Sequence, residues 1–431
     1  MSLNISNYIP EGTRDYLYED CYTKICIENK LQKLFMNNGY DAIASPALEY
    51  YDVFYKRRES LHEEDMYKLF ERSGKIMVLR PDMTIPIARI AACKLDESCF
   101  PAKFCYKSNI FRLNDSYDGK LSEITQCGIE IIGTKSIKSD ADAVIEAIKA
   151  LKCAGLDDFV IEIGQAEFFK TLVSKTQLDK SQTEILRKAV ENKNYSLLNE
   201  MLNSYSVLIP KEVYKILLEL PKLFGGTEIF DYVKEIYKET ENSEALINLK
   251  DVYRLIESAG FGRYISIDLG MVQHNDYYTG VILRGYSKYA GENILAGGRY
   301  DNLISEFGKD MPATGMAVNV NCLLEALRRQ GVHMRNTMNF LIYGSSQTTE
   351  MCYRIMSALQ SYNMKAELSL SEDKVSTLKY AEFKKIINVV CVIDDNIIDL
   401  MKYRNGQWSS KKMGMGEFNE YCGSSIDKGQ N

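Results

Sequence analysis

A block of helical segments interrupts an otherwise strand-rich sequence between about residues 166 and 260. Before this block, two apolar runs at 103–113 and 124–132 flank a polar, glycine-containing stretch, which predicts a long antiparallel hairpin. After the block, strand patterns return at 264–269 and 280–283. We interpret this order as one sheet domain that carries a helical insertion.

The remaining elements of this domain follow from hydrophobic periodicity and from glycine or proline at their ends. They are expected as a helix at 16–38, an extended run at 40–51, a hairpin at 67–70 and 76–79, a helix at 140–154, a strand at 159–163 and a strand leading into a helix at 312–329.

A second domain is expected because 431 residues are too many for one ordinary core. Beyond about residue 334, strand patterns at 339–343, 365–368 and 387–393 surround a helical pattern at 348–362. This alternation is typical of a small parallel or mixed sheet. We therefore predict domains at 1–334 and 335–420, followed by a polar, disordered tail at 421–431.

Composition excludes several classes of protein. The net charge is −6 and no sustained lysine or arginine stripe occurs, which disfavours nucleic acid as a partner. Eleven cysteines without a C-x-x-C pair, and only three histidines, argue against a zinc site or a disulfide framework. The N-terminus has no signal pattern and the apolar run at 386–393 is too short for a bilayer. We expect a cytoplasmic protein without metal, cofactor or membrane contact.

Six short motifs occur in a fixed order and together resemble histidyl-tRNA synthetases. They are residues 10–15 (Pro-Glu-Gly-Thr-Arg-Asp), 39–46, 79–84 (Leu-Arg-Pro-Asp-Met-Thr), Phe111-Arg112 with Gln126 and Glu130, Asp276-Tyr277-Tyr278, and 296–301 (Ala-Gly-Gly-Arg-Tyr-Asp). Each motif alone is weak, but their order is specific. The resemblance implies an α+β fold: a class II aminoacyl-tRNA synthetase-like antiparallel sheet with flanking helices and a helical insertion, plus a small C-terminal α/β domain.

The same resemblance implies a pocket for histidine. Its ammonium group would meet Asp82, Thr84 and Gln126, where Asp82 replaces the longer glutamate that is usual in the synthetases. Glu130 and Tyr277 or Tyr278 would bind the imidazole ring, and Arg112 the carboxylate or another anion. An imidazole needs an acceptor and a donor on opposite edges, which suits this set. Gln126 and Glu130 are four residues apart on an expected strand and therefore share a face.

The positions that would stabilise phosphate are altered. An arginine three residues before Asp276 is replaced by Gln273. Lys120 and Ser122 stand where the family has arginines, and Asn321-Cys322 replaces a Glu-Arg pair. Losing one such group typically costs about 2–4 kcal/mol of transition-state stabilisation. We therefore assign no catalytic residue and expect aminoacylation to be lost.

A retained amino-acid pocket without phosphate-binding arginines resembles the regulatory subunits of ATP phosphoribosyltransferase. Residues 79–90 and the segment His274 to Gly280 are more similar to that family than to the synthetases. The resemblance implies a non-catalytic subunit that supports a short-form catalytic subunit in the first step of histidine biosynthesis. L-histidine would be its effector, and the expected assembly is a homodimer within a hetero-oligomer.

Two alternatives stay open at this point. An active histidyl-tRNA ligase would account for the overall length and for a C-terminal unit that faintly resembles an anticodon-binding domain. A synthetase-like module that senses uncharged tRNA is disfavoured by the acidic chain. We interpret the C-terminal unit as a structural or protein-contacting remnant, with Asp394, Asp395 and Asp399 where tRNA would require cations.

Overall fold

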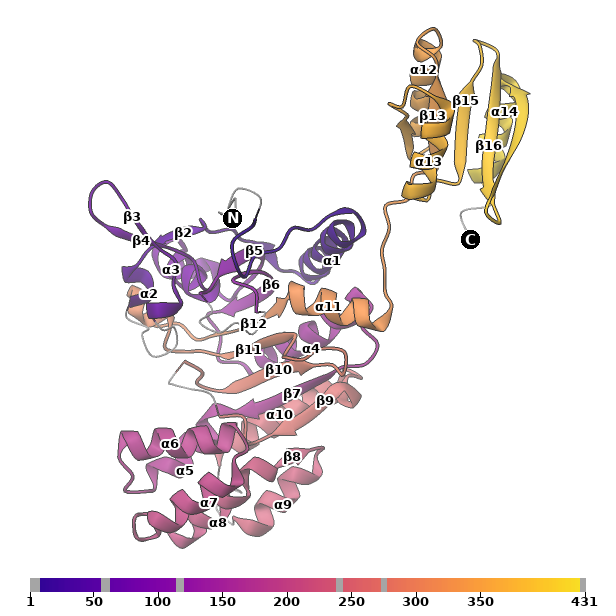
Figure 1. Cartoon of the computed structure of the whole chain (residues 1–431). Helices are drawn as coiled ribbons and strands as arrows, with labels where there is room; N and C mark the ends of the chain where they lie inside the picture. Colours follow the sequence, from indigo (N-terminus) through magenta and orange to yellow (C-terminus); the bar gives the residue numbers. More distant parts are fainter. Residues whose placement is uncertain (1–7, 56–62, 114–119, 238–242, 273–276, 427–431) are drawn as a thin grey trace, which may run out of the picture. The chain divides into compact units, whose positions relative to one another are not determined.

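The computed structural model describes residues 8–55, 63–113, 120–237, 243–272 and 277–426. The chain divides into two compact units, Met1–Met334 and Arg335–Asn431, and we describe each by itself (Figure 1).

A nine-stranded sheet forms the framework of the larger unit. In sheet order its strands are β1 (Asp41–Ala42), β5 (Ala102–Phe111), β6 (Glu123–Ile132), β12 (Ala313–Asn319), β11 (Leu295–Arg299), β10 (Val281–Tyr286), β7 (Val160–Gln165), β9 (Ile265–Asp268) and β8 (Phe224–Gly225). In sheet order, the six neighbouring strands β5, β6, β12, β11, β10 and β7 pair antiparallel. The pairs β1–β5 and β7–β9 are parallel. The expected long hairpin is β5–β6, which pairs from Ala102 opposite Ile132 to Phe111 opposite Glu123.

Helices cover one face of this sheet. They are α1 (Tyr18–Asn37), α4 (Ile137–Ala154), α10 (Glu244–Ser258) and α11 (Val320–Gln330). Helix α4 begins at Ser136, whose hydroxyl accepts a hydrogen bond from the Lys138 amide, and ends at Gly155 in the left-handed conformation. Its alanine-rich face is buried, so its backbone can approach the strands closely. Alternate residues of β6, such as Ile129 and Ile131, belong to the same core.

The expected helical insertion is confirmed with one correction. Its helices are α5 (Ala166–Ser174), α6 (Lys180–Glu191), α7 (Tyr195–Ser204), α8 (Lys211–Glu219), α9 (Glu228–Ile236) and α10. Helices α5 to α9 gather beside the β8 edge of the sheet (Figure 1). Within this block the two-residue strand β8 pairs with β9, although no strand was expected there. Two residues cannot display the alternation that identifies a strand.

A separate three-stranded sheet follows the motif at 39–46. Its strands and adjoining helices are β2 (Leu48–Tyr50), β3 (Lys68–Phe70), β4 (Ile76–Leu79), α2 (Asp52–Tyr55) and α3 (Thr84–Lys94). The hairpin expected at 67–70 and 76–79 is β3–β4. Buried Glu49 on β2 pairs with Arg89 on α3 at 2.6 Å, which fixes α3 against this sheet.

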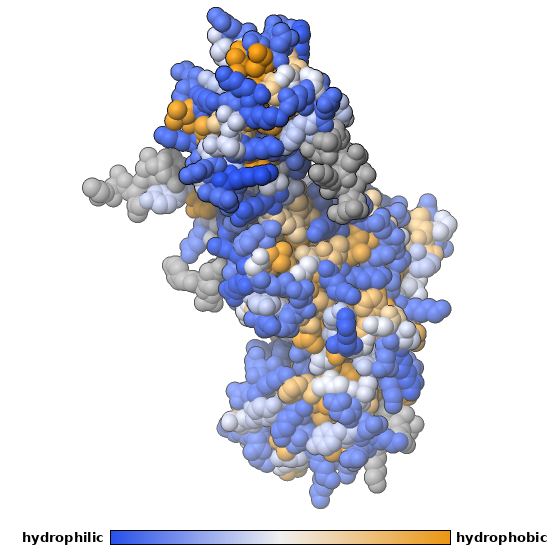
Figure 2. Space-filling model, turned by 90° about the vertical axis from the view of Figure 1, so that its right-hand side faces the viewer, coloured by the Kyte–Doolittle hydropathy of each residue, from blue (hydrophilic) through white to orange (hydrophobic). Residues whose placement is uncertain are grey.

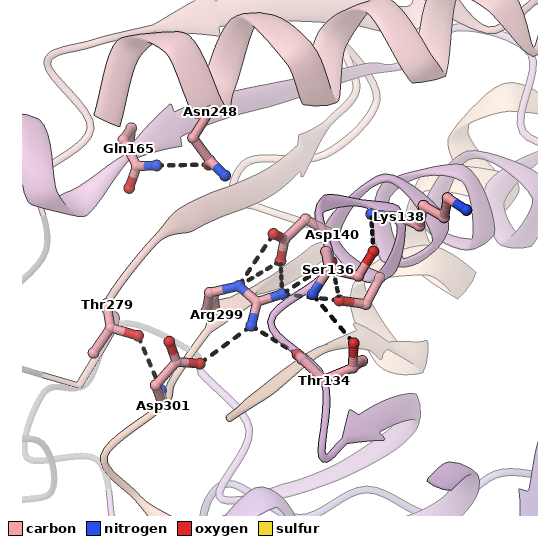
Figure 3. Close-up of polar contacts among 10 residues, drawn as sticks. Thr134, Ser136, Lys138, Asp140, Gln165, Asn248, Thr279, Arg299 and Asp301 are labelled. Carbon is pink, nitrogen blue, oxygen red and sulfur yellow. Dashed lines mark hydrogen bonds and ion pairs between the residues drawn. The ribbon is translucent and has the colours of Figure 1, made fainter. Parts of the chain in front are cut away.

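A buried ion pair joins β11 to α4 (Figure 3). Arg299 Nε lies 3.0 Å from Asp140 Oδ1, and the two side chains are only 8% and 1% exposed. The guanidinium also donates to the Thr134 carbonyl at 3.1 Å, to Asp301 at 3.2 Å and to Ser139 Oγ at 2.8 Å. Burial raises the pKa of Asp140 and Arg299 opposes that rise. Because its donors are engaged in this way, the charge is tolerated inside the core.

The smaller unit contains a mixed five-stranded sheet in the order β14-β13-β15-β16-β17. Its elements are β13 (Phe340–Gly344), α12 (Thr349–Ser361), β14 (Ala366–Leu368), α13 (Lys374–Lys384), β15 (Asn388–Val392), β16 (Ile397–Arg404), β17 (Gln407–Gly414) and α14 (Met415–Ile426). The first three strands are parallel, and β16 and β17 are antiparallel.

The end of the chain corrects the sequence interpretation. The tail expected from residue 421 lies partly within α14, where Phe418 and Cys422 are buried. The two are four positions apart, so one helix face packs on the smaller sheet despite the polar composition around it.

Hydrophilic residues dominate the face drawn in Figure 2, and hydrophobic residues are spread among them in separate groups. Among the residues that the structure describes, no helix is both long and apolar enough to cross a membrane.

The Arg299 ion pair can be tested by removing one partner. Arg299→Leu should lower the free energy of unfolding by about 3–5 kcal/mol, because it leaves Asp140 buried without its cation. Arg254→Leu is the control: its pair with Asp251 spans 3.1 Å, but the side chains are 63% and 40% exposed. It should change stability by less than about 1 kcal/mol. Equal shifts of the urea midpoint for both variants would contradict the role given to Arg299.

Candidate functional site

A cleft of about 1310 Å³ opens over the central strands of the larger sheet. Its walls come from β5, β6, β10, β11 and β12, from the start of α3, from α11 and from the segment around Arg14. On β6, Gln126 and Glu130 face the cleft, whereas Ile129 and Ile131 between and beside them face the core. The period of two along a strand therefore produces one polar and one apolar face.

The structure brings together all seven residues that the sequence assigned to a histidine pocket. Asp82, Thr84, Arg112, Gln126, Glu130, Tyr277 and Tyr278 line this one cleft. They come from four segments of the chain, spread over almost 200 positions. Their role in binding histidine stays a prediction.

Glu130 is the most deeply buried of the seven, with 1% of its surface exposed. Thr84 Oγ1 donates to its carboxylate at 2.8 Å, and the Tyr300 hydroxyl donates to the other oxygen. Burial raises the pKa of Glu130 to about 8; the hydrogen bonds from Tyr300 and Thr84 lower it, and the charge of Asp82 raises it. When a buried carboxyl group of this kind ionises, its negative charge is stabilised by a further hydrogen-bond donor, which a ligand can supply.

Two features of this pocket were not found from the sequence. Tyr300 belongs to the motif at 296–301, but that motif does not predict its bond to Glu130. The Tyr300 ring stacks on the Tyr277 ring, with centroids 5.9 Å apart. Gly315 lies opposite Glu130 on β12, and a Cβ there would come within 1.9 Å of Glu130 Oε2. Glycine is therefore needed for the carboxylate to lie against the strand. A glycine in a strand indicates that another group approaches the backbone closely, but the sequence does not identify that group.

Asp82 and Arg112 also have structural contacts. Asp82 Oδ1 accepts a hydrogen bond at 2.9 Å from the amide of Ile85, in the first turn of α3. Arg112 Nε donates to the carbonyl of Pro81 at 2.8 Å. The two side chains are therefore held at the same bend before α3, and both face the cleft.

The four altered positions differ in their placement. Lys120 is exposed on the cleft wall, and Cys322 also lines it. Ser122 is buried instead. A Cβ on Gly12 would come within 2.3 Å of the Ser122 Oγ, so a larger residue at position 122 would displace the N-terminal segment around Gly12. Gln273 lies outside the described residues.

Neutral and acidic groups surround Cys322. Its thiol donates to Glu292 at 3.4 Å, and burial, followed by the charge of Glu292, raises its pKa to about 12. Neighbouring Asn321 accepts from the Thr125 amide at 2.8 Å and donates to the Tyr16 hydroxyl at 2.6 Å. This end of the cleft therefore holds a protonated thiol and an amide that is already bonded.

The cleft nevertheless contains guanidinium groups to which the sequence pattern assigns no role. Arg14, Arg284 and Arg329 line its walls, in addition to Arg112. Each of the three is paired with a carboxylate: Arg14 with Asp20 at 3.3 Å, Arg284 with Glu191 at 3.1 Å and Arg329 with Glu325 at 3.0 Å. They come from separate elements, and an incoming anion must compete with these carboxylates.

The raised pKa of Glu130 predicts a pH-dependent stability. Folded Glu130 binds a proton more tightly than the unfolded chain does, so its ionisation destabilises the fold as the pH rises from about 4.5 to about 8. The loss is at most about 1.4 kcal/mol per pH unit. Glu130→Gln should lack this slope and gain stability relative to the parent across that range. If the unfolding free energies of the two ligand-free proteins changed with pH in parallel, the raised pKa of Glu130 would be contradicted.

Comparisons with known proteins match most of this chain. A family model described as histidyl-tRNA synthetase matches residues 12–323. The ATP phosphoribosyltransferase regulatory subunit of Clostridium acetobutylicum is 46% identical over 390 residues, which cover 90% of this chain and 95% of that protein. The protein of the same name from Bacillus mycoides is 39% identical over 391 residues, covering 90% and 93%.

Solved structures share the fold. The crystal structure of an ATP phosphoribosyltransferase regulatory subunit/histidyl-tRNA synthetase from Bacillus halodurans has a TM-score of 0.80 and 29% identity, covering 90% of this chain and 98% of that one. Histidyl-tRNA synthetase from Nostoc sp. PCC 7120 also has a TM-score of 0.80, with 17% identity over 97% and 99% of the chains, and supports the fold alone. The chain therefore belongs to the ATP phosphoribosyltransferase regulatory subunits, a non-catalytic family with the histidyl-tRNA synthetase fold.

Proposed function

We propose that this protein is the histidine-sensing subunit of an ATP phosphoribosyltransferase. In this proposal the short catalytic subunit requires it for activity, and L-histidine bound in the cleft inhibits the complex at the first step of histidine biosynthesis. The observation that carries the proposal is buried Glu130, held by Thr84 and Tyr300 among the seven cleft residues. A homodimer within a hetero-oligomer is part of the same proposal.

The chemistry of the cleft suits free histidine. An imidazole N–H would donate to Glu130, which the protein has already desolvated, and a tyrosine hydroxyl could donate to the other ring nitrogen. Asp82 and Gln126 offer oxygen acceptors for the ammonium group. The carboxylate needs a guanidinium, and Arg112 is one of the cleft arginines that can bind it or another anion.

The other end of the cleft supports a regulatory rather than a catalytic role. Activating an amino acid with ATP develops negative charge on phosphate, which preorganised cations must stabilise. Here Cys322 is a neutral thiol beside Glu292, and Ser122 is buried beneath Gly12. A pocket that binds histidine without reacting it can use its binding energy to favour one state of a complex. Couplings of this kind are typically about 1–3 kcal/mol.

A histidyl-tRNA ligase is the second candidate. The match to the synthetase family model favours it, as do the guanidinium groups of Arg14, Arg112 and Arg329 in the cleft. Pyrophosphate exchange separates the two functions: the purified protein with histidine and ATP should show no exchange above background. Robust exchange would establish the ligase and end the regulatory proposal.

Reconstitution tests the regulatory function directly. Mixing this protein with a short-form catalytic subunit should give a stable complex on gel filtration and stimulate formation of phosphoribosyl-ATP. Added L-histidine should then inhibit the mixture. Absence of both a complex and stimulation would contradict the proposal, and stimulation without inhibition would restrict it to activation.

Glu130 should determine the affinity for histidine. Glu130→Gln removes the carboxylate that would accept from the imidazole once it is ionised, so at or above about pH 8 the calorimetric Kd should rise by about 10- to 100-fold. Glu325→Gln is the matched control, because Glu325 lines the same cleft but belongs to α11 and pairs with Arg329. It should leave the Kd within about twofold. An unchanged Kd for Glu130→Gln would show that the ring is bound elsewhere.

A further inference from the structure

One of the three ion-paired arginines of the cleft joins the sheet to the helical insertion. Arg284, on β10, lines the cleft, and its Nη2 lies 3.1 Å from Oε1 of Glu191. Glu191 is the last residue of α6, in the helical insertion, and it also lines the cleft. The two residues are 93 positions apart, so the pair joins the insertion to the sheet.

Arg284 is more shielded from water than the other ion-paired arginines of the cleft. Its side chain is 22% exposed and that of Glu191 is 25% exposed. Arg14 and Arg329 are 43% and 55% exposed in their pairs. Because water and salt screen exposed charges, Arg284 is the arginine of these three that can bind an anion most strongly.

Arg284 also lies close to the residues expected to bind histidine. Burial raises the pKa of Tyr278, and the positive charges of Arg284 and Arg112 both oppose that rise. Burial lowers the pKa of Arg284, but Tyr286 and Glu191 outweigh it and stabilise the charged form. A permanent cation therefore lies beside the tyrosine wall of the cleft.

We propose that Arg284 binds the carboxylate of the amino-acid ligand and that Glu191 occupies this place until the ligand arrives. The inference rests on the proposed function, because it assumes an amino acid in the cleft. The ligand carboxylate has the charge and geometry of the Glu191 carboxylate that Arg284 already holds. Exchange rather than addition is expected, because Glu162 lies opposite Arg284 on β7 and a second acidic side chain is therefore already next to this guanidinium.

The displaced carboxylate keeps a partner. Glu191 also pairs with Arg187 on the same helix, and Arg187 is held by Glu184 at 2.8 Å as well. Arg187 donates to the carbonyl of Val272 at 3.1 Å. The exchange would therefore release α6 from β10 while α6 stays attached to Val272, so that the insertion responds to whether the cleft is filled.

Calorimetry with two ligands tests the exchange. L-histidinol carries a hydroxymethyl group in place of the carboxylate of L-histidine and should not compete with Glu191. Arg284→Gln should weaken L-histidine binding by about 10- to 100-fold and change L-histidinol binding by less than about twofold. Glu191→Gln should tighten L-histidine binding by about 3- to 10-fold, because a neutral amide competes less well for the guanidinium.

Glu184→Gln is the matched control, since it removes a carboxylate from Arg187 and leaves Glu191 on Arg284; its Kd for L-histidine should stay within about twofold of the parent. Weaker L-histidine binding by Glu191→Gln would overturn the inference, because Glu191 would then contact the ligand ammonium. Equal losses for both ligands in Arg284→Gln would also overturn it. If the parent binds neither ligand, the proposed function fails and this inference with it. If Arg284→Gln does not fold, the direction of the change in the L-histidine Kd of Glu191→Gln still tests the inference.

Discussion

The geometry of the cleft depends on the buried pair of Arg299 and Asp140. Arg299 fixes β11 to α4 through Asp140. The backbone carbonyl of Arg299 also accepts a hydrogen bond from the Thr279 amide at 2.8 Å. Thr279 Oγ1 in turn accepts from the Asp301 amide at 2.9 Å. These bonds hold the end of the tyrosine segment beside β11. They also set the position of Tyr300, which follows Arg299 directly and donates to Glu130. An ion pair on the core side of the sheet thus positions Tyr300 and Glu130 on the cleft side.

Electrostatics divides this cleft into two chemically different ends. At one end a desolvated carboxylate is surrounded by hydroxyl donors, with Arg112 and Arg284 nearby. At the other end, the protonated thiol of Cys322 and the bonded amide of Asn321 lie near Glu292, and Arg14 and Arg329 are already paired with carboxylates. Membership of the regulatory-subunit family is consistent with this division, because a non-catalytic subunit does not have to stabilise charge that develops on a phosphate. The Arg284–Glu191 pair adds a direct connection between the cleft and the helical insertion.

Much of the fold and of the candidate site could be predicted because local patterns carry that information. The period of two in β6 placed Gln126 and Glu130 on one face, and the ordered motifs identified segments that converge. Two short strands were not predicted: β8 has only two residues, and β11 overlaps the Ala-Gly-Gly-Arg-Tyr-Asp motif at 296–301, where the sequence pattern indicates no strand. The burial of Ser122 under Gly12 was also invisible, because nothing local to Ser122 encodes a contact 110 positions away.

The sequence by itself determined which residue types occupy each face and which family pattern they follow, since periodicity and motif order are properties of the chain. Only the tertiary structure decided the chemical state and partners of these groups. The pKa of Glu130 rises because strands and helices from distant segments exclude water from it. Arg284 meets Glu191 because α6 packs beside β10. Burial and charge pairing depend on three-dimensional neighbours, and a linear pattern does not specify those.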